Sequence, residues 1–373
     1  MSSGGVRHLY VHLPFCASRC GYCDFVTLVG RHGDHASYVD GLLAELELER
    51  RWLADELETI FVGGGTPTFT EAPALRRLLR ELPAAEEVTV EANPETVTPE
   101  LAALLFDGGV TRVSLGAQTF DERLLEVLDR RARPEDVRRA FHHLRDASFD
   151  NINLDLIYGI PGQEPSDLER DLGEALSLGP EHLSCYELEA KPGTRFTHEH
   201  GEELARQAES MEGYFELVVD TLTEAGYRWY ETANFCQDGR RARHNLAYWL
   251  GRDYLGLGIG AVSTVESIRW RNLPALPRYL SALTSGQAPP RELEPLAPST
   301  QAQERLMLGL RLDDPVPFAL VEEAIDAASL GRLERLGLVE RRDGGLSLTH
   351  RGRFLGGGVT AELLAEIPAN NYN

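Results

Sequence analysis

Cys16, Cys20 and Cys23 stand close together near the start of the chain, in the spacing CxxxCxxC. Three thiolates on one short loop can ligate three irons of a [4Fe–4S] cluster and leave the fourth iron open to a small molecule. Pro14 and Gly21 disfavour a helix through all three cysteines, so we expect a metal-binding loop rather than one buried face of a helix. A zinc site would require a fourth protein ligand.

The other two cysteines do not supply that ligand at any close spacing. Cys185 and Cys236 each stand far from the first three in sequence. We expect both to be buried as small hydrophobic residues.

A glycine-rich run follows a predicted strand over 58–63. Gly64, Gly65 and Thr66 belong to the run GGGTPT, in which the missing side chains let the backbone approach a ligand closely. An ordinary tight turn fits the same residues equally well.

Further polar residues stand in or just after predicted strands. Carboxylates there can accept hydrogen bonds from hydroxyl or ammonium groups, and an arginine can hold a carboxylate through two parallel bonds. Asp155 is the clearest case, because a charged residue inside an apolar run needs a partner. Tyr10 stands at the end of the first predicted strand. From the sequence, it fits a half-buried structural tyrosine as well as it fits a residue that contacts a ligand. The complete set is Tyr10, Glu91, Gln118, Arg130 and Asp155.

His244, Tyr248 and Trp249 stand together in the run RHNLAYW. An imidazole with two aromatic rings nearby can ligate iron and stack on a porphyrin. Taken alone, such a histidine is more often a structural polar residue.

The elements that must position these residues alternate between strands and helices. Strands are predicted over 7–13, 58–63, 86–92, 111–117, 151–158 and 182–188, with amphipathic helices over 38–53, 72–81, 99–106, 121–128, 134–147 and 165–178. Six such units predict an α/β fold, a partial TIM-like (β/α)6 barrel whose reactive groups gather at the carboxyl ends of the strands. A polar helix is expected over 202–226.

The chain is predicted to have three parts: a barrel with its extension over 1–265, a Pro-rich linker over 266–298 and a small winged-helix-like domain over 299–360. In the last part, helices over 299–312, 316–325 and 331–336 precede a hairpin of 338–341 and 346–349 that turns at Asp343, Gly344 and Gly345. We expect this domain to pack against the barrel or to shape a partner surface.

Charge and hydropathy exclude several classes of function. A net charge of −22 disfavours nucleic acid and anionic membrane surfaces as partners, because both would add repulsion. No apolar run approaches the roughly 20 residues that cross a bilayer. Without a basic or apolar leader at the first residues, the expected location is the cytoplasm, whose reducing conditions suit an iron–sulfur cluster.

Together these motifs resemble the radical S-adenosylmethionine (SAM) family, specifically the oxygen-independent coproporphyrinogen III oxidases and the related heme chaperones, over residues 6–358. The resemblance implies that SAM occupies the open iron and yields a 5′-deoxyadenosyl radical on reduction. It also implies a set of SAM contacts: Tyr10, Gly64, Gly65, Thr66, Glu91, Gln118, Arg130 and Asp155.

Two departures separate the branches of this family. The oxidases resemble CxxxCxxCxC, whereas Phe25 stands at the last of these positions here; they also carry a long N-terminal extension, and only fifteen residues precede Cys16. The run HNxxYW is similar to the heme-chaperone branch and implies heme contacts at His244, Tyr248 and Trp249.

The expected function is therefore that of a heme chaperone. It would bind a [4Fe–4S] cluster, SAM and heme, take electrons from a donor, and pass heme to acceptor proteins, with membrane-bound acceptors among the candidates. Oxidative decarboxylation of coproporphyrinogen III is the alternative, and we expect that activity to be absent.

Overall fold

Nine strands form the main sheet, in the order β11-β1-β4-β5-β6-β7-β8-β10-β9. The computed structural model describes residues 5–191 and 195–365. The first six strands of the barrel run parallel: β1 (His8–Leu13), β4 (Leu57–Gly64), β5 (Ala85–Ala92), β6 (Arg112–Gln118), β7 (Ile152–Tyr158) and β8 (His182–Glu187). They match the six predicted strands closely.

Three short strands extend the sheet at its two edges. β11 (Leu255–Leu257) pairs in parallel with β1, while β10 (Asn234–Cys236) and β9 (Arg228–Glu231) are antiparallel beyond β8. The edge strands β9 and β11 are not paired with each other in the described residues, so the barrel stays open, as predicted.

The two faces of the barrel strands differ in polarity. On β1, Leu9, Val11 and Leu13 are fully buried in the main hydrophobic core, whereas the alternate residues are polar. His8, Tyr10 and His12 therefore share the inner face. A lumen with polar side chains suits a polar ligand better than the aliphatic filling that closes most TIM barrels.

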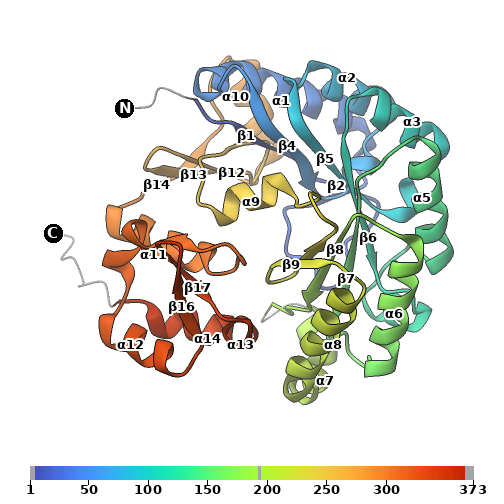
Figure 1. The fold of residues 1–373 in the computed structure, drawn as a ribbon. Coiled ribbons are helices and arrows are strands. Elements are labelled where there is room, and N and C mark those ends of the chain that lie inside the picture. The colour runs from blue at the N-terminus through green and yellow to red at the C-terminus, as the bar shows by residue number, and fades with distance from the viewer. Residues whose placement is uncertain (1–4, 192–194, 366–373) are drawn as a thin grey trace.

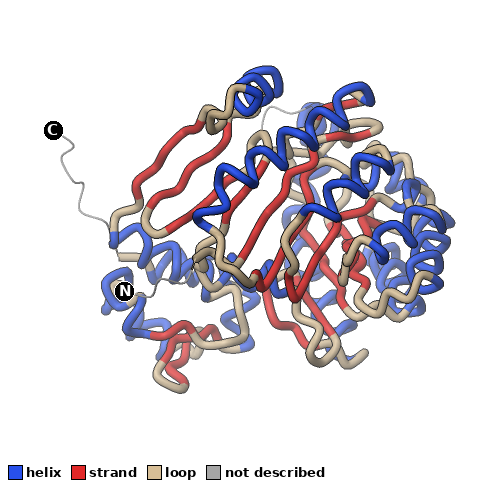
Figure 2. Tube along the Cα trace, turned by 90° about the horizontal axis from the view of Figure 1, so that it is seen from above, coloured by secondary structure: helices blue, strands red, loops and turns tan. Residues whose placement is uncertain are grey.

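Helices lie outside the strands (Figures 1 and 2). They are α1 (His35–Glu49), α2 (Ala72–Glu81), α3 (Pro99–Asp107), α4 (Glu122–Val127), α5 (Pro134–Asp146) and α6 (Pro165–Leu178). The single polar helix expected over 202–226 is instead two helices, α7 (Arg195–Gln207) and α8 (Met211–Glu224), separated by a short 3₁₀ turn, Ala208–Ser210.

The Pro-rich segment expected to be a linker is folded against the barrel, which corrects that prediction. β13 (Ile268–Asn272) pairs with β12 (Val262–Val265) and with β14 (Arg291–Pro295), and α10 (Leu276–Thr284) packs on α1. Its prolines resemble those of a linker, but Pro277 lies in the first turn of α10, where proline is compatible with a helix. The barrel extension therefore reaches the start of the last domain.

The C-terminal domain has its own hydrophobic core. It contains α11 (Pro298–Gly309), α12 (Ala327–Arg335), α13 (His350–Phe354), α14 (Gly356–Leu363) and the predicted hairpin, β16 (Val339–Arg342) with β17 (Gly345–Leu348). The helix expected over 316–325 is absent, because β15 (Val316–Pro317) pairs with β17 and two 3₁₀ turns follow it. Within the described residues, no helix combines the length and apolar character needed to cross a bilayer.

Candidate functional site

The three clustered cysteines lie on a loop at the carboxyl end of β1. The loop leaves β2 (Phe15–Cys16) and returns at β3 (Leu28–Val29), which pairs with β2 and closes its base. None of residues 17–27 is helical, as predicted. Cys16 is buried, while Cys20 and Cys23 are partly exposed.

The electrostatic environment of the three thiols fits a bound iron–sulfur cluster. Burial, with smaller contributions from the neighbouring thiols of Cys23 and Cys20, raises the pKa of the Cys16 thiol to about 11. Burial also raises the pKa of Cys23. The thiolates of Cys16 and Cys23 would therefore be stabilised by cationic iron beside them. Cys185 and Cys236 are buried on other strands, where they offer no fourth ligand.

A chain of polar contacts links two of these cysteines to the ends of neighbouring strands. Thr66 Oγ1 lies 3.5 Å from Cys16 Sγ and accepts a hydrogen bond from Asn93 Nδ2 at 3.0 Å. Arg130 donates to Asn93 Oδ1 at 3.0 Å, and its Nη1 lies 3.7 Å from Cys20 Sγ. Asn93 was not predicted from the sequence as a site residue. Its position two residues after Glu91, at the end of the same strand, could have indicated it.

Gly64 and Gly65 let the end of β4 approach the cysteine loop. Gly64 has a φ of +114°, and a Cβ there would lie 2.5 Å from the His12 ring. A Cβ on Gly65 would lie 2.9 Å from Cys16 Sγ and 2.7 Å from the backbone of Pro14. The glycines are thus required by the close approach of the loop itself, whatever ligand they also contact.

Two half-buried carboxylates face the same end of the lumen. Glu91 accepts a hydrogen bond from Gly64 N at 3.0 Å, and burial together with the Asp155 carboxylate raises the pKa of Glu91 to about 7. Asp155 accepts from Asn153 Nδ2 at 2.8 Å and from Ser114 Oγ at 3.0 Å, and burial raises its pKa as well. A cationic ligand between them would relieve their repulsion.

Tyr10 lies in the middle of β1 rather than at its end, which corrects the expected position. Its hydroxyl donates to His12 Nδ1 at 3.0 Å, because His12 Nε2 carries the proton that is donated to Val26 O at 2.8 Å. Burial lowers the pKa of His12 to about 4, so the imidazole is neutral. His12 was not singled out from the sequence.

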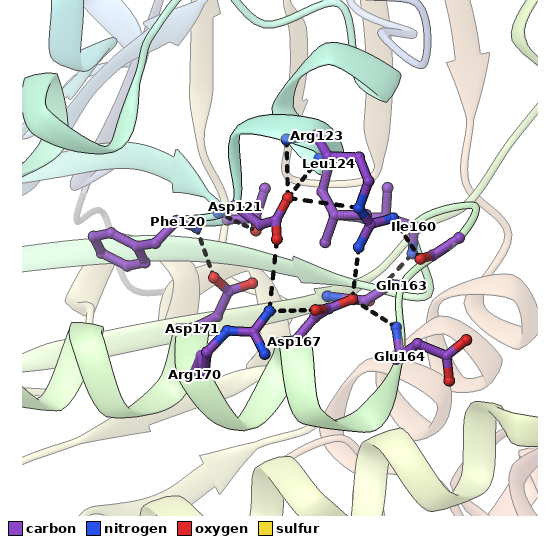
Figure 3. Close-up of polar contacts among 12 residues, drawn as sticks. Phe120, Asp121, Arg123, Leu124, Ile160, Gln163, Glu164, Asp167, Arg170 and Asp171 are labelled. Carbon is purple, nitrogen blue, oxygen red and sulfur yellow. Dashed lines mark hydrogen bonds and ion pairs between the residues drawn. The ribbon is translucent and has the colours of Figure 1, made fainter.

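Gln118 and Arg130 are held by the loop that follows β6. Gln118 ends the strand with a φ of +67°. Beyond it, Phe120 N donates to Asp171 at 2.6 Å, and Arg123 binds both Gly162 O at 2.6 Å and Asp167 at 2.8 Å (Figure 3). These contacts join the segment after β6 to the loop after β7 and to α6. From the same segment, Arg130 donates to Gly116 O at 2.8 Å and reaches the cysteine loop at Cys20.

The HNxxYW segment lies elsewhere, on α9 (Arg243–Trp249) at the amino end of the strands. His244 is 1% exposed; its Nδ1 lies 2.7 Å from Thr59 Oγ1 and its Nε2 lies 3.0 Å from Tyr248 OH. Burial lowers its pKa to about 3. Both ring nitrogens of His244 are engaged in hydrogen bonds within the barrel, and its role as a heme contact stays a prediction.

Trp249 serves the contact between barrel and C-terminal domain. Arg311 lies over its ring at 4.5 Å, and the ring packs beside Leu312. Tyr248 is half-buried and holds His244. None of these three residues contacts the cysteine loop directly.

Comparison with known proteins agrees with this architecture. Residues 10–175 match the model of the radical SAM superfamily, and residues 296–355 match that of the HemN C-terminal domain. A solved structure of coproporphyrinogen III oxidase (HemN) from Escherichia coli, a radical SAM enzyme, superposes with a TM-score of 0.80 at 23% identity and covers 96% of this chain and 90% of that chain. This likeness supports the fold.

Curated relatives match the chain over most of its length. The heme chaperone HemW of Mycobacterium tuberculosis (strain ATCC 25618 / H37Rv) is 37% identical over 371 residues, which covers 95% of this chain and 94% of the relative. HemW of Bacillus subtilis (strain 168) is 33% identical over 384 residues, with 97% and 100% covered. HemW of Escherichia coli (strain K12) is 37% identical over 261 residues, 68% of each chain.

Proposed function

The chain belongs to the heme chaperone family of the radical SAM superfamily, and on that premise we propose that it binds a [4Fe–4S] cluster, SAM and heme and passes the heme to acceptor proteins. The observation that carries the proposal is the match to a heme chaperone over 95% of the chain.

Cys16, Cys20 and Cys23 hold the cluster in this proposal. When bound, the cluster and SAM supply one-electron chemistry. Gly64, Gly65 and Thr66 shape the edge of the SAM site, Glu91 and Asp155 place negative charge beside a cationic ligand, and Tyr10, Gln118 and Arg130 complete it. The support is their convergence around the thiols, through the contacts of Thr66 and Arg130 with the cysteines.

Heme, its acceptors and an electron donor are the proposed partners. The net charge of −22 makes nucleic acid an unsuitable partner. We place the protein in the cytoplasm, where the cysteines stay reduced and the cluster can be retained.

The test compares heme binding with porphyrin chemistry in the same preparation. The protein, with its cluster reconstituted anaerobically, is titrated with hemin and, separately, incubated with SAM, a reductant and coproporphyrinogen III. We expect one heme per chain and no protoporphyrinogen IX. Cys20→Ala should lose most of the iron and sulfide of the cluster, whereas Cys185→Ala should retain them.

The alternative function is oxidative decarboxylation of coproporphyrinogen III. Turnover of coproporphyrinogen III without stoichiometric heme binding would replace the chaperone proposal with the oxidase. Full cluster content in Cys20→Ala would remove the cysteine loop from the cluster assignment.

A further inference from the structure

A cavity of about 530 Å³ opens at the amino end of β1, on the side of the barrel opposite the cysteine loop. The start of β1 forms one wall of the cavity, and α9 with the turn after it forms another. Its volume lies in the range of small-molecule and cofactor sites. Nothing in the cluster or SAM site uses these residues.

His8 presents a ring nitrogen to this cavity. The side chain is 7% exposed, and its Nδ1 lies 3.0 Å from Thr59 Oγ1. Its Nε2 makes no hydrogen bond with any described residue, the nearest acid being Glu58 at 4.0 Å. Burial lowers the pKa of His8, so the ring is neutral and has a lone pair to offer.

Thr59 connects His8 to His244. The Thr59 hydroxyl has one proton and lies between His8 Nδ1 at 3.0 Å and His244 Nδ1 at 2.7 Å. When His8 donates to Thr59, Thr59 donates to His244, and His8 Nε2 is left unprotonated toward the cavity. A metal-binding imidazole characteristically donates its other N–H to such a partner.

The rest of the cavity wall combines apolar side chains with charged ones, in which three arginines (Arg7, Arg243 and Arg252) outnumber the two acids Glu58 and Asp253. Leu250, 45% exposed, and the half-buried Leu246 supply apolar surface from α9 and its end. Arg252 lines the same cavity, and its side chain has no hydrogen-bond or ion-pair partner among residues 5–191 and 195–365. Because the chain carries a net charge of −22, an unpaired arginine favours a carboxylate ligand at this position.

We propose that this cavity is the heme site, with His8 Nε2 as an iron ligand, Arg252 as the partner of a propionate, and His244 as a positioning residue that acts on His8 through Thr59. The inference rests on the proposed heme-binding function and names its site. His8 and Leu13 are five residues apart on β1, so the heme would lie about 17 Å from the start of the cysteine loop. Heme binding would then be independent of the cluster.

The test uses the full chain with its cluster reconstituted, and reads hemin affinity and the absorbance spectrum of the bound heme. His8→Ala should weaken hemin binding about tenfold or more and shift the Soret band, and added imidazole should restore the wild-type spectrum. Arg252→Glu, on the surface, should weaken binding without changing the spectrum. His142→Ala, an exposed histidine on α5, is the matched control and should change neither. Iron content and circular dichroism establish that each variant is folded.

Three outcomes overturn the site. A His8→Ala variant with wild-type affinity and spectrum would place the heme elsewhere and leave the proposed function standing. Loss of heme binding in folded Cys20→Ala protein would move the heme to the cluster end of the barrel. If the wild-type protein binds no hemin at all, the proposed function fails together with the site. A His244→Phe variant that binds heme with an unchanged spectrum would remove His244 from the network.

Discussion

Buried ionisable side chains set the chemistry of the lumen at the scale of single residues. Burial is the largest cause that raises the pKa of Glu91 and of Asp155, and it outweighs the hydrogen bonds that each carboxylate accepts. Burial lowers the pKa of His12 to about 4, and the neutral ring accepts the hydrogen bond from the Tyr10 hydroxyl. The end of the lumen below the cysteine loop therefore holds two carboxylates whose pKa values are raised, although the guanidinium of Arg112 partly offsets their charge.

SAM binding should depend on pH through Glu91. Its pKa is about 7, so the carboxylate takes up a proton as the pH falls below 7 and loses its attraction for the cationic ligand. We expect the Kd for SAM to rise by up to about tenfold per pH unit below 7 in cluster-loaded protein. Equilibrium dialysis with labelled SAM between pH 5.5 and 8 measures it.

Glu91→Gln should flatten that pH profile, because the amide keeps an acceptor for Gly64 N but does not titrate. Glu47→Gln, on the exposed face of α1, should retain the wild-type slope. Equal slopes in the wild type and Glu91→Gln would exclude Glu91 from the SAM site.

The spacing of the cysteines in the sequence was sufficient to predict their loop, but the HNxxYW spacing was not sufficient to predict where the His244 side chain points. CxxxCxxC needs only a short non-helical loop, and residues 17–27 form one. His244 was expected to face a ligand, yet α9 turns it toward Thr59 and Tyr248. Which side of a short helix faces the barrel depends on contacts with β4 and β5, distant in sequence, such as that of Glu87 with His244 N at 3.0 Å.

At the scale of elements, one buried acid ties α1 to the segment expected to be a linker. Glu45 is fully buried and accepts from Gly258 N at 2.8 Å, Asn272 Nδ2 at 2.7 Å and Tyr279 OH at 2.7 Å. It therefore joins α1 to the loop after β11, to β13 and to α10. No local sequence pattern predicts these contacts, because Glu45 and its partners are more than 200 residues apart. The proline content of residues 266–298 was the only signal, and it resembled that of a linker.

Glu45→Ala should lower the free energy of unfolding by about 3 kcal/mol or more, since three buried donors lose their acceptor. The urea midpoint of the folded chain measures this. Glu45→Gln should cost less, because an amide oxygen can still accept. A midpoint equal to wild type in Glu45→Ala would mean that α10 and β13 do not depend on α1.

The same residue gives the stability a pH dependence of known sign. Burial raises the pKa of Glu45 from 4.5 to about 7, so between those values the folded chain binds a proton that the unfolded chain does not. Its contribution therefore becomes more favourable as the pH falls from 7 toward 4.5, and this trend should vanish in Glu45→Gln.

At the scale of the whole molecule, the two ends of the barrel hold different groups of polar residues. The cysteine loop and the acidic lumen lie at the carboxyl end of the strands, while α9, the cavity beside His8 and the contact with the C-terminal domain lie at the other end. The alternation of strands and helices in the sequence predicted the barrel and the gathering of reactive groups at the carboxyl ends of its strands. It did not predict how the C-terminal domain is attached, because that attachment uses charged residues from both parts.

The attachment depends on a buried acid. Glu231, at the end of β9, is fully buried and accepts from Arg311 Nε at 2.7 Å, while Arg311 also covers the Trp249 ring. Arg241 adds a second link, to Asp313 at 2.9 Å. These contacts place the end of α11 and its following residues against β9 and α9.

Arg311→Ala should lower the free energy of unfolding by about 2 kcal/mol, because the Glu231 carboxylate stays buried after losing its charged partner and Trp249 loses its cover. The matched control is Arg332→Ala, which breaks the exposed Arg332–Glu362 pair inside the C-terminal domain and should cost at most about 0.5 kcal/mol. Urea unfolding gives both values, and limited proteolysis should cut Arg311→Ala between the two parts before wild type. Equal costs for the two arginines would show that the contact between barrel and C-terminal domain rests on its apolar residues, with Glu231 adding nothing to the attachment.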